Sequence, residues 1–347
     1  MKKVMALILT LLMALACLTG CSKSGQQPAS STGGSSGDPA AASTSEDPAA
    51  NWPEKGIRVL VGFSAGGTSD LGTRLLFEAA KEELGVDIIV ENITGAGGWN
   101  AWSELKNANP DGYTLALVTD PTIYGGYLDP SMNREDSIHD FTPIVNHVSD
   151  DACVAVNPSD SRFGTFADLI EYAKENEVTA TTTGVGSQVH LMMLRMNDEL
   201  GTKFVPVHTT GTADGKAMIL GGNVDCFFAC VGDIAPSANS GELKCLAVSS
   251  EERSEFMPDV PTMVEQGFPL IYAYSARGII GPAGMDPAVV EKLAGILENA
   301  MASEDHKAAM DQMSLRINFI GHDEYAQMLN DDEELMKSYS GLFGWAS

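Results

Sequence analysis

The most constraining feature of this sequence is a strand, loop and helix pattern that recurs along the first half of the chain. Short apolar runs begin near residues 57, 87 and 114, and a glycine-rich or polar turn and then a helical pattern follow the first two. The spacing of about thirty residues is that of a βαβ unit, because a helix must cross the sheet before the next parallel strand begins. The pattern therefore predicts an α/β architecture with parallel strands covered by helices.

The pattern starts again after residues 150–151, which predicts a second α/β lobe. Further strands are expected over residues 153–156, 178–183, 203–207, 224–229 and 243–249. An extended run over 271–280 then precedes amphipathic helices over 287–301 and 323–339. We expect these last helices to return to the first lobe, because two chain crossings between lobes make a natural hinge.

Charge limits the partners that this chain can have. The sequence holds 21 Lys and Arg residues against 47 Asp and Glu residues, which gives a formal net charge of -26. Repulsion at this charge disfavours nucleic acid and acidic membrane surfaces as partners. After the N-terminal segment, no run reaches the roughly 18–20 apolar residues of a membrane span. Hydrophobic residues make up 44% of the chain, enough to bury a core in each lobe.

The first twenty residues have the layout of a secretory signal peptide. Lys2 and Lys3 precede an uncharged apolar segment that ends in Leu-Thr-Gly-Cys at residues 18–21. This ending resembles the bacterial lipobox and predicts cleavage before a lipid-modified Cys21. Residues 22–51 are rich in Ser, Gly, Ala and Pro, a composition typical of a flexible tether. We expect an extracytoplasmic protein held at the outer face of the cell membrane through its lipid only, with 1–20 removed and 21–51 as tether.

Four further cysteines, Cys153, Cys226, Cys230 and Cys245, lie in the predicted folded part. Disulfides are allowed outside the cytoplasm, and the sequence leaves their pairing open. A strand over 224–229 would hold Cys226 and Cys230 about 13 Å apart, too far for a mutual bridge. No Cys or His spacing is typical of a zinc site, so no metal is expected.

Two glycine-rich turns, each between a strand and a helix, are the candidate ligand-binding elements. They are residues 62–70 in the first lobe and 183–188 in the second. A helix start presents unpaired N–H groups and a positive dipole end, and glycine lets a ligand approach the backbone. Such a turn can hold a small anion without a charged side chain. Glycines here could instead serve only to turn the chain, but two such loops at strand ends favour a cleft between the lobes.

Several ordered motifs extend this interpretation. They are residues 52–55, 57–58, 62–70, 90–92 with 95–98, 110–114, 184–187 with 190–191, 205–206, 220–225, 241–244, 258–262 and 281–284. Together they resemble the Bug family, the substrate-binding proteins of tripartite tricarboxylate transporters, over about residues 52–300. The resemblance implies a two-lobe α/β fold like that of periplasmic binding proteins, a flytrap whose lobes are mixed or parallel sheets flanked by helices. Lobe 1 is expected over 52–152 and 270–347, and lobe 2 over 153–269.

The function that the resemblance implies is solute capture. A small carboxylate or zwitterionic metabolite would be held between the lobes and delivered to membrane permease subunits, with no cofactor and no catalysis by a monomeric receptor. The expected ligand-binding residues are Phe63, Ser64, Ala65, Gly66, Gly67, Thr68, Ser69, Asp70, Thr119, Asp120, Gly184, Gly186, Ser187, Gln188 and Arg277, the last if it points inward.

The sequence departs from the family pattern at three places. Asp120 and Thr68 stand where the family commonly has a small residue and a third glycine, and residues 206–211 lack the usual Tyr-Lys. A carboxylate at Asp120 would favour a ligand ammonium group, which makes an amino acid or another zwitterion one hypothesis. A solvated turn residue before proline is the alternative.

Two other functions stay open at this point. Residues 62–66 match the G-x-S-x-G pattern of a nucleophile elbow, which would make Ser64 the nucleophile of a serine hydrolase. His190, His208 and His322 lie downstream, but no HGGG-type oxyanion segment is seen. His190 is interpreted as a packing or capping residue instead. A lipoprotein sensor that presents its ligand to a signalling receptor is the other alternative.

Overall fold

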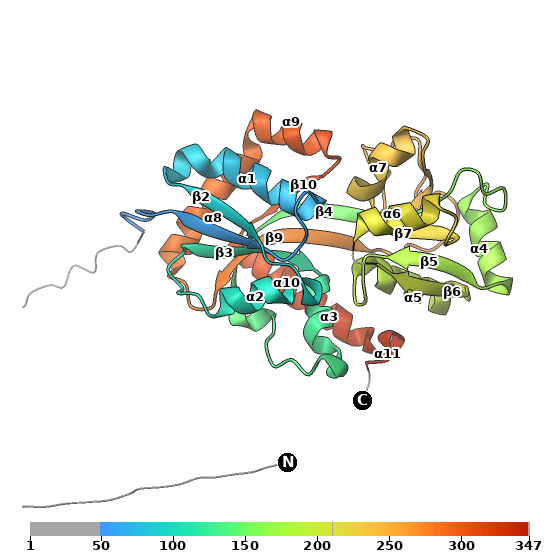
Figure 1. The fold of residues 1–347 in the computed structure, drawn as a ribbon, viewed down its shortest axis with the longest axis horizontal. Coiled ribbons are helices and arrows are strands. Elements are labelled where there is room, and N and C mark those ends of the chain that lie inside the picture. The colour runs from blue at the N-terminus through green and yellow to red at the C-terminus, as the bar shows by residue number, and fades with distance from the viewer. Residues whose placement is uncertain (1–48, 210, 346–347) are drawn as a thin grey trace, which may run out of the picture. The chain divides into compact units, whose positions relative to one another are not determined.

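A ten-stranded mixed sheet runs through the computed structural model, which describes residues 49–209 and 211–345 (Figure 1). The strand order is β2-β1-β3-β9-β4-β7-β5-β6, and β8 and β10 pair with β4 beside this path. The strands are β1 (Ile57–Val61), β2 (Ile88–Asn92), β3 (Thr114–Asp120), β4 (Phe141–Val156), β5 (Val178–Thr182), β6 (Phe204–His208), β7 (Cys226–Cys230), β8 (Lys244–Val248), β9 (Tyr274–Pro282) and β10 (Ile317–Ile320).

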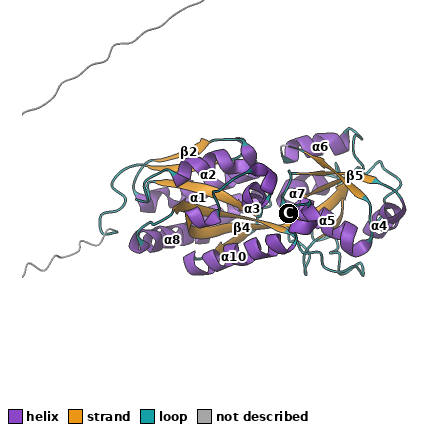
Figure 2. Ribbon diagram, turned by 90° about the horizontal axis from the view of Figure 1, so that it is seen from below, coloured by secondary structure: helices purple, strands orange, loops and turns teal. Residues whose placement is uncertain are grey.

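Helices cover both faces of the sheet, as Figures 1 and 2 show. They are α1 (Thr68–Leu84), α2 (Trp99–Lys106), α3 (Thr122–Leu128), α4 (Phe166–Glu175), α5 (Gln188–Leu200), α6 (Thr212–Leu220), α7 (Val231–Asn239), α8 (Pro287–Ala302), α9 (Glu304–Gln312), α10 (His322–Ser338) and α11 (Ser340–Phe343). Below, "first lobe" means β1–β3 and β10 with α1–α3 and α8–α10, and "second lobe" means β5–β8 with α4–α7.

Two long strands connect the lobes. β4 pairs with β9 from Phe141 to Asp151 and then pairs with β7 and β8 from Ala152 onward. Helix α8 packs against α1, and α10 packs against β4. The predicted mixed sheet is confirmed, since β1 is parallel to β2 and β3, whereas β9 is antiparallel to both of its neighbours.

β4 is longer than the sequence predicts. Only residues 153–156 are expected as strand there, but the strand begins at Phe141. Its middle carries Asn146, His147, Asp150 and Asp151, which hide the apolar pattern of a strand although all four are buried. These polar residues find partners in the packed structure, so their burial is compatible with the sheet. The expected boundary between the lobes at residues 152 and 153 thus falls inside one continuous strand.

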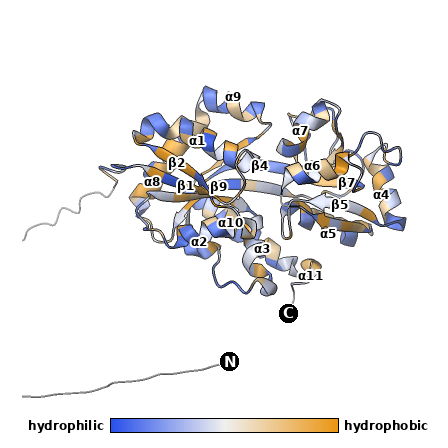
Figure 3. Cartoon of the chain, in the orientation of Figure 1, coloured by the Kyte–Doolittle hydropathy of each residue, from blue (hydrophilic) through white to orange (hydrophobic). Residues whose placement is uncertain are grey.

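The core of the first lobe lies on both faces of its sheet. One cluster joins Leu115 of β3 and Ile279 of β9 to α1 and α8. The other joins Ala116 and Val118 to α2, α3 and α10. Neighbouring residues of β3 therefore point to different helix layers, as strand geometry requires. Figure 3 shows hydrophobic residues on β1, β2 and β7, whereas hydrophilic residues dominate the outlying α9.

Candidate functional site

The first glycine loop connects β1 to α1, and its own side chains hold its shape. The Asp70 carboxylate accepts hydrogen bonds from the Gly66 amide at 2.8 Å, from Arg74 at 2.9 Å and from Asn92 at 2.8 Å. Asp70 is 1% exposed. Burial alone would raise its pKa, but these donors outweigh burial and lower it. The geometry thus uses Asp70 to stabilise the loop.

The start of α1 is left open by this arrangement. Gly67 is the residue before the helix, and no side chain in the described part of the chain caps its first turn. The amides of Thr68, Ser69 and Asp70 therefore face out of the helix end, where the helix dipole is positive. Ser64, Ala65 and Gly66 are exposed beside them. The loop can accept an anion from the solvent side.

The second glycine loop connects β5 to α5, and part of it is already occupied. The Gly186 amide donates to Nδ1 of His190 at 3.2 Å, and the Ser187 hydroxyl donates to the Gly184 carbonyl at 2.8 Å. A Cβ on Gly186 would lie 3.0 Å from the Gly125 Cα in α3, so this glycine permits a close contact between the two lobes.

His190 packs in the second lobe, as the sequence interpretation expects. The residue is 7% exposed, and its ring centroid lies 4.6 Å from that of His208 and 5.2 Å from that of Phe343. Burial, with a smaller contribution from the charge of His208, lowers the pKa of His190 to about 4. A neutral ring can accept the Gly186 hydrogen bond at physiological pH.

Both loops approach the first turn of α7. The Thr68 hydroxyl lies 3.4 Å from a carboxylate oxygen of Asp233, a contact between the first and second lobes. From the second loop, the Gln188 amide nitrogen lies 3.0 Å from the Cys230 sulfur. Both predicted ligand loops therefore contact residues at the start of α7.

Arg277 is buried at the same place, between the lobes on β9. Its Nη2 donates to Asp150 at 3.1 Å, and the other Asp150 oxygen accepts from the Gly232 amide at 3.0 Å. Burial alone would lower the pKa of Arg277. The carboxylates of Asp150 and Asp233 outweigh burial, so the pKa of Arg277 is raised. Burial raises the pKa of Asp150 to about 6, even though Arg277 opposes this shift. Arg277 and Asp150 thus form a buried ion pair at neutral pH.

Thr119 and Arg277 are register partners across β3 and β9, so their side chains emerge side by side on one face of the sheet. Both are buried, with exposed fractions of 5% and 6%. In the described structure, neither the Thr119 hydroxyl nor Nη1 of Arg277 has a hydrogen-bond partner. We call Thr68, Thr119, Asp150, Asp233 and Arg277 the α7 cluster.

Asp120 lies on the opposite face from Thr119. It belongs to the layer of α3 and α10, where burial and the neighbouring carboxylate of Asp332 raise its pKa well above the usual value. Tyr124 and Tyr274 border this pair, and Tyr274 donates to Asp332. The structure therefore does not bring Asp120 into the α7 cluster, and the acidic residues found there are Asp150 and Asp233.

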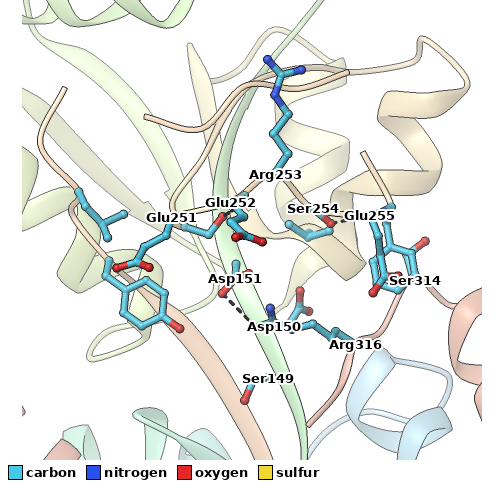
Figure 4. Close-up of a pocket in the computed structure, with 15 residues that line it drawn as sticks. Ser149, Asp150, Asp151, Glu251, Glu252, Arg253, Ser254, Glu255, Ser314 and Arg316 are labelled. Atoms are coloured by element: carbon cyan, nitrogen blue, oxygen red, sulfur yellow. Dashed lines mark hydrogen bonds and ion pairs between the residues drawn. The ribbon is translucent and has the colours of Figure 1, made fainter. Parts of the chain in front are cut away.

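A cavity of about 680 Å³ adjoins the cluster at Asp150 and Val231 (Figure 4). Asp151, Glu251, Glu252 and Glu255 line it, and the Arg316 guanidinium lies 3.5 Å from Asp151. No residue of either glycine loop lines this cavity. Asp150 and Asp233 were not predicted as site residues from the sequence. An acid inside a strand or in the first turn of a helix cannot be distinguished there from an ordinary structural residue.

In the described structure no hydrogen bond involves the Ser64 hydroxyl, whereas His208 contacts Thr182 and His322 contacts the Pro143 carbonyl. The four described cysteines are free thiols, and no group of three or more metal-binding side chains is found among the described residues. Cys21 lies outside the described residues. The predicted tether also lies outside them, apart from residues 49–51.

A mixed α/β sheet whose two parts share long connecting strands is the fold of periplasmic binding proteins. The solved periplasmic binding protein BugD has this fold, with a TM-score of 0.74 and 27% identity over 84% of this chain and 99% of BugD. The profile of TctC, the tripartite tricarboxylate transporter family receptor, matches residues 73–339. The chain belongs to this family of solute receptors, so the resemblance found in the sequence is confirmed.

Curated relatives agree with this assignment. The UPF0065 protein in the gbd 5' region of Cupriavidus necator is 30% identical over 88% of this chain and 93% of that protein. Protein BugT of Bordetella pertussis is 30% identical over 73% of this chain and 78% of BugT. Within the described residues, no helix has the length and apolar character that crossing a bilayer requires.

Proposed function

We propose that this protein captures a small carboxylate between its lobes and delivers it to the membrane subunits of a tripartite tricarboxylate-type transporter. The observation that carries the proposal is the pair of buried groups without partners, Nη1 of Arg277 and the Thr119 hydroxyl, beside the open start of α1. Buried polar groups are normally hydrogen-bonded, so such a pair is what a ligand acceptor would complete.

The ligand would also bind the first glycine loop. Its carboxylate would accept hydrogen bonds from the amides at the start of α1, each worth about 1.5–3 kcal/mol when the acceptor is charged. Residues 63–69, Thr119, Gly184, Ser187, Gln188 and Arg277 form the proposed site. Asp70 and the Gly186 amide would support the loops, because their hydrogen bonds are made within the protein.

Lobe closure would provide the mechanism of capture. The lobes meet at Thr68 and Asp233 and again at Gly125 and Gly186, so a bound solute would be enclosed by both. A ligand that contacts both lobes favours the closed form by the binding energy that closure adds. Attachment through a lipid on Cys21 would keep the receptor beside its permease.

Titration calorimetry with a panel of mono-, di- and tricarboxylates tests this function. We expect at least one member to bind, with an affinity that falls by about tenfold or more in Arg277→Lys, which keeps the charge but loses the second guanidinium arm. Absence of binding by the whole panel would refute a carboxylate receptor. A fluorophosphonate probe that labels Ser64, and no longer labels Ser64→Ala, would instead establish the hydrolase.

A further inference from the structure

The α7 cluster contains more negative charge than its single guanidinium can match. Asp150 is satisfied, because Arg277 and the Gly232 amide bind its two oxygens. Asp233 is not matched in this way. Its one contact in the described structure is the neutral Thr68 hydroxyl at 3.4 Å, and its side chain is half-buried between the lobes.

The same cluster offers two donors that need an acceptor. Nη1 of Arg277 and the Thr119 hydroxyl are buried side by side without partners. A carboxylate is the acceptor that a guanidinium arm and a hydroxyl bind best, since it can take both hydrogen bonds with one charged group. The cluster therefore offers the donors that one ligand carboxylate needs.

A ligand with carboxylates alone would leave the charge of Asp233 uncompensated. Its first carboxylate would add to Asp150 and Asp233, which already face one guanidinium. A second carboxylate that reached the adjoining cavity would meet Asp151, Glu251 and Glu252 there. The two arginines that line this cavity are engaged, Arg253 with Glu265 and Arg316 with Asp151. The missing partner is a cation on the ligand.

We propose that the ligand is a zwitterion of the amino-acid type, with its carboxylate at Arg277 and Thr119 and its ammonium group at Asp233. This inference rests on the proposed function, because it places the ligand in the same site between the lobes. It assigns to Asp233 the role of choosing an ammonium-bearing solute. The ammonium group would replace the long Thr68 contact with a charge-assisted hydrogen bond.

Matched pairs of probes test the proposal by titration calorimetry on the purified receptor. Each pair differs by one α-amino group: succinate and L-aspartate, glutarate and L-glutamate, propionate and L-alanine, 3-phenylpropionate and L-phenylalanine. We expect the amino acid of at least one pair to bind about tenfold or more tighter than its partner. Asp233→Asn should remove this preference, and Asp233→Ser serves as a second variant in case the first is poorly folded.

Asp305→Asn is the matched control, because Asp305 is likewise an acid in the first turn of a helix but is exposed on α9. It should leave the preference unchanged. If Asp233 only stabilises the start of α7, Asp233→Asn and Asp233→Ser will alter stability and neither will alter the preference for the amino acid. That result overturns the inference. Tighter binding by the partners that lack the amino group also overturns it while supporting a carboxylate receptor. If no pair binds but another carboxylate of the panel does, only the zwitterion inference fails; if neither the pairs nor the panel binds, both proposals fail.

Discussion

Asp70 and Asp120 are both buried carboxylates that the sequence predicts as ligand-binding residues, and their surroundings shift their pKa values in opposite directions. Asp70 has donors on both oxygens, which lower its pKa. Asp120 has the carboxylate of Asp332 beside it, and burial together with this charge raises its pKa. The partners of a side chain therefore decide its role, and sequence position alone does not.

His190 gives a pH-dependent prediction at this scale. Its folded pKa of about 4 lies below the usual value of 6.5, so the stability that the neutral ring provides is present above pH 6.5 and is lost as the pH falls toward 4. His190→Asn keeps an acceptor for the Gly186 amide without this titration. Between pH 7 and pH 4 the variant should lose about 3 kcal/mol less stability than the wild type.

Urea unfolding at a series of pH values measures this difference. His322→Asn is the control, because it removes a half-exposed histidine at the start of α10. An unchanged pH profile in His190→Asn would contradict a lowered pKa of His190 as the source of this pH dependence.

At the scale of elements, the starts of α1 and α5 differ although both follow glycine loops. The start of α5 is capped, since Ser187 accepts from the His190 amide at 3.3 Å. The start of α1 has Gly67 in the capping position, with no capping side chain in the described structure. An uncapped helix start leaves donors for a ligand, so α1 contributes more of the proposed anion site.

Gly67→Val tests the α1 element. Gly67 has an extended backbone that a valine can adopt, and a Cβ there would meet only the Ser64 carbonyl, at 3.4 Å. The fold should therefore persist, with a melting temperature within about 4 °C of the wild type. The new side chain would fill the approach to the α1 amides and weaken carboxylate binding by about tenfold or more.

Calorimetry with the tightest ligand of the panel, together with a circular dichroism spectrum, checks both parts. Gly295→Val, on α8 with open space around it, is the control for a glycine replaced by valine. Unchanged affinity in Gly67→Val would exclude this loop from the site.

At the scale of the whole molecule, β4 and β9 decide how the two lobes are joined. Asp150 and Arg277 sit on these strands and form an ion pair, and Asp150 also holds the Gly232 amide of the second lobe. The pair thus connects the shared strands to the α7 turn. A buried pair of this kind is costly to break, because the remaining charge stays buried without a partner.

Removing one partner of this pair tests its structural role. Arg277→Met should lower the free energy of unfolding by about 3–5 kcal/mol, because it strands the Asp150 carboxylate. The double variant Asp150→Asn with Arg277→Met should be more stable than Arg277→Met, since the Asp150 charge is removed as well and Asn can still accept from Gly232. Equal or greater loss in the double variant would show that the two residues act independently.

Much of the fold follows from local patterns. The spacing of apolar runs predicts the parallel βα units, and the observed β1, β2 and β3 begin within about a residue of their expected positions. The length of β4 is not predictable in this way, because its buried polar residues interrupt the apolar alternation. α9 and β10 are not predicted either, because each has only a short apolar pattern.

The sequence by itself determined the lobes' βα units, the two glycine loops and the family, because these depend on residue order within short segments. Only the tertiary structure decided which polar groups share one site. It brought Thr68, Asp150, Asp233 and Arg277 together from four separate segments, and it turned Asp120 to the other face of the sheet from Thr119. The physical reason is that strand pairing and lobe contact set distances between residues far apart in the chain, and charge compensation depends on those distances.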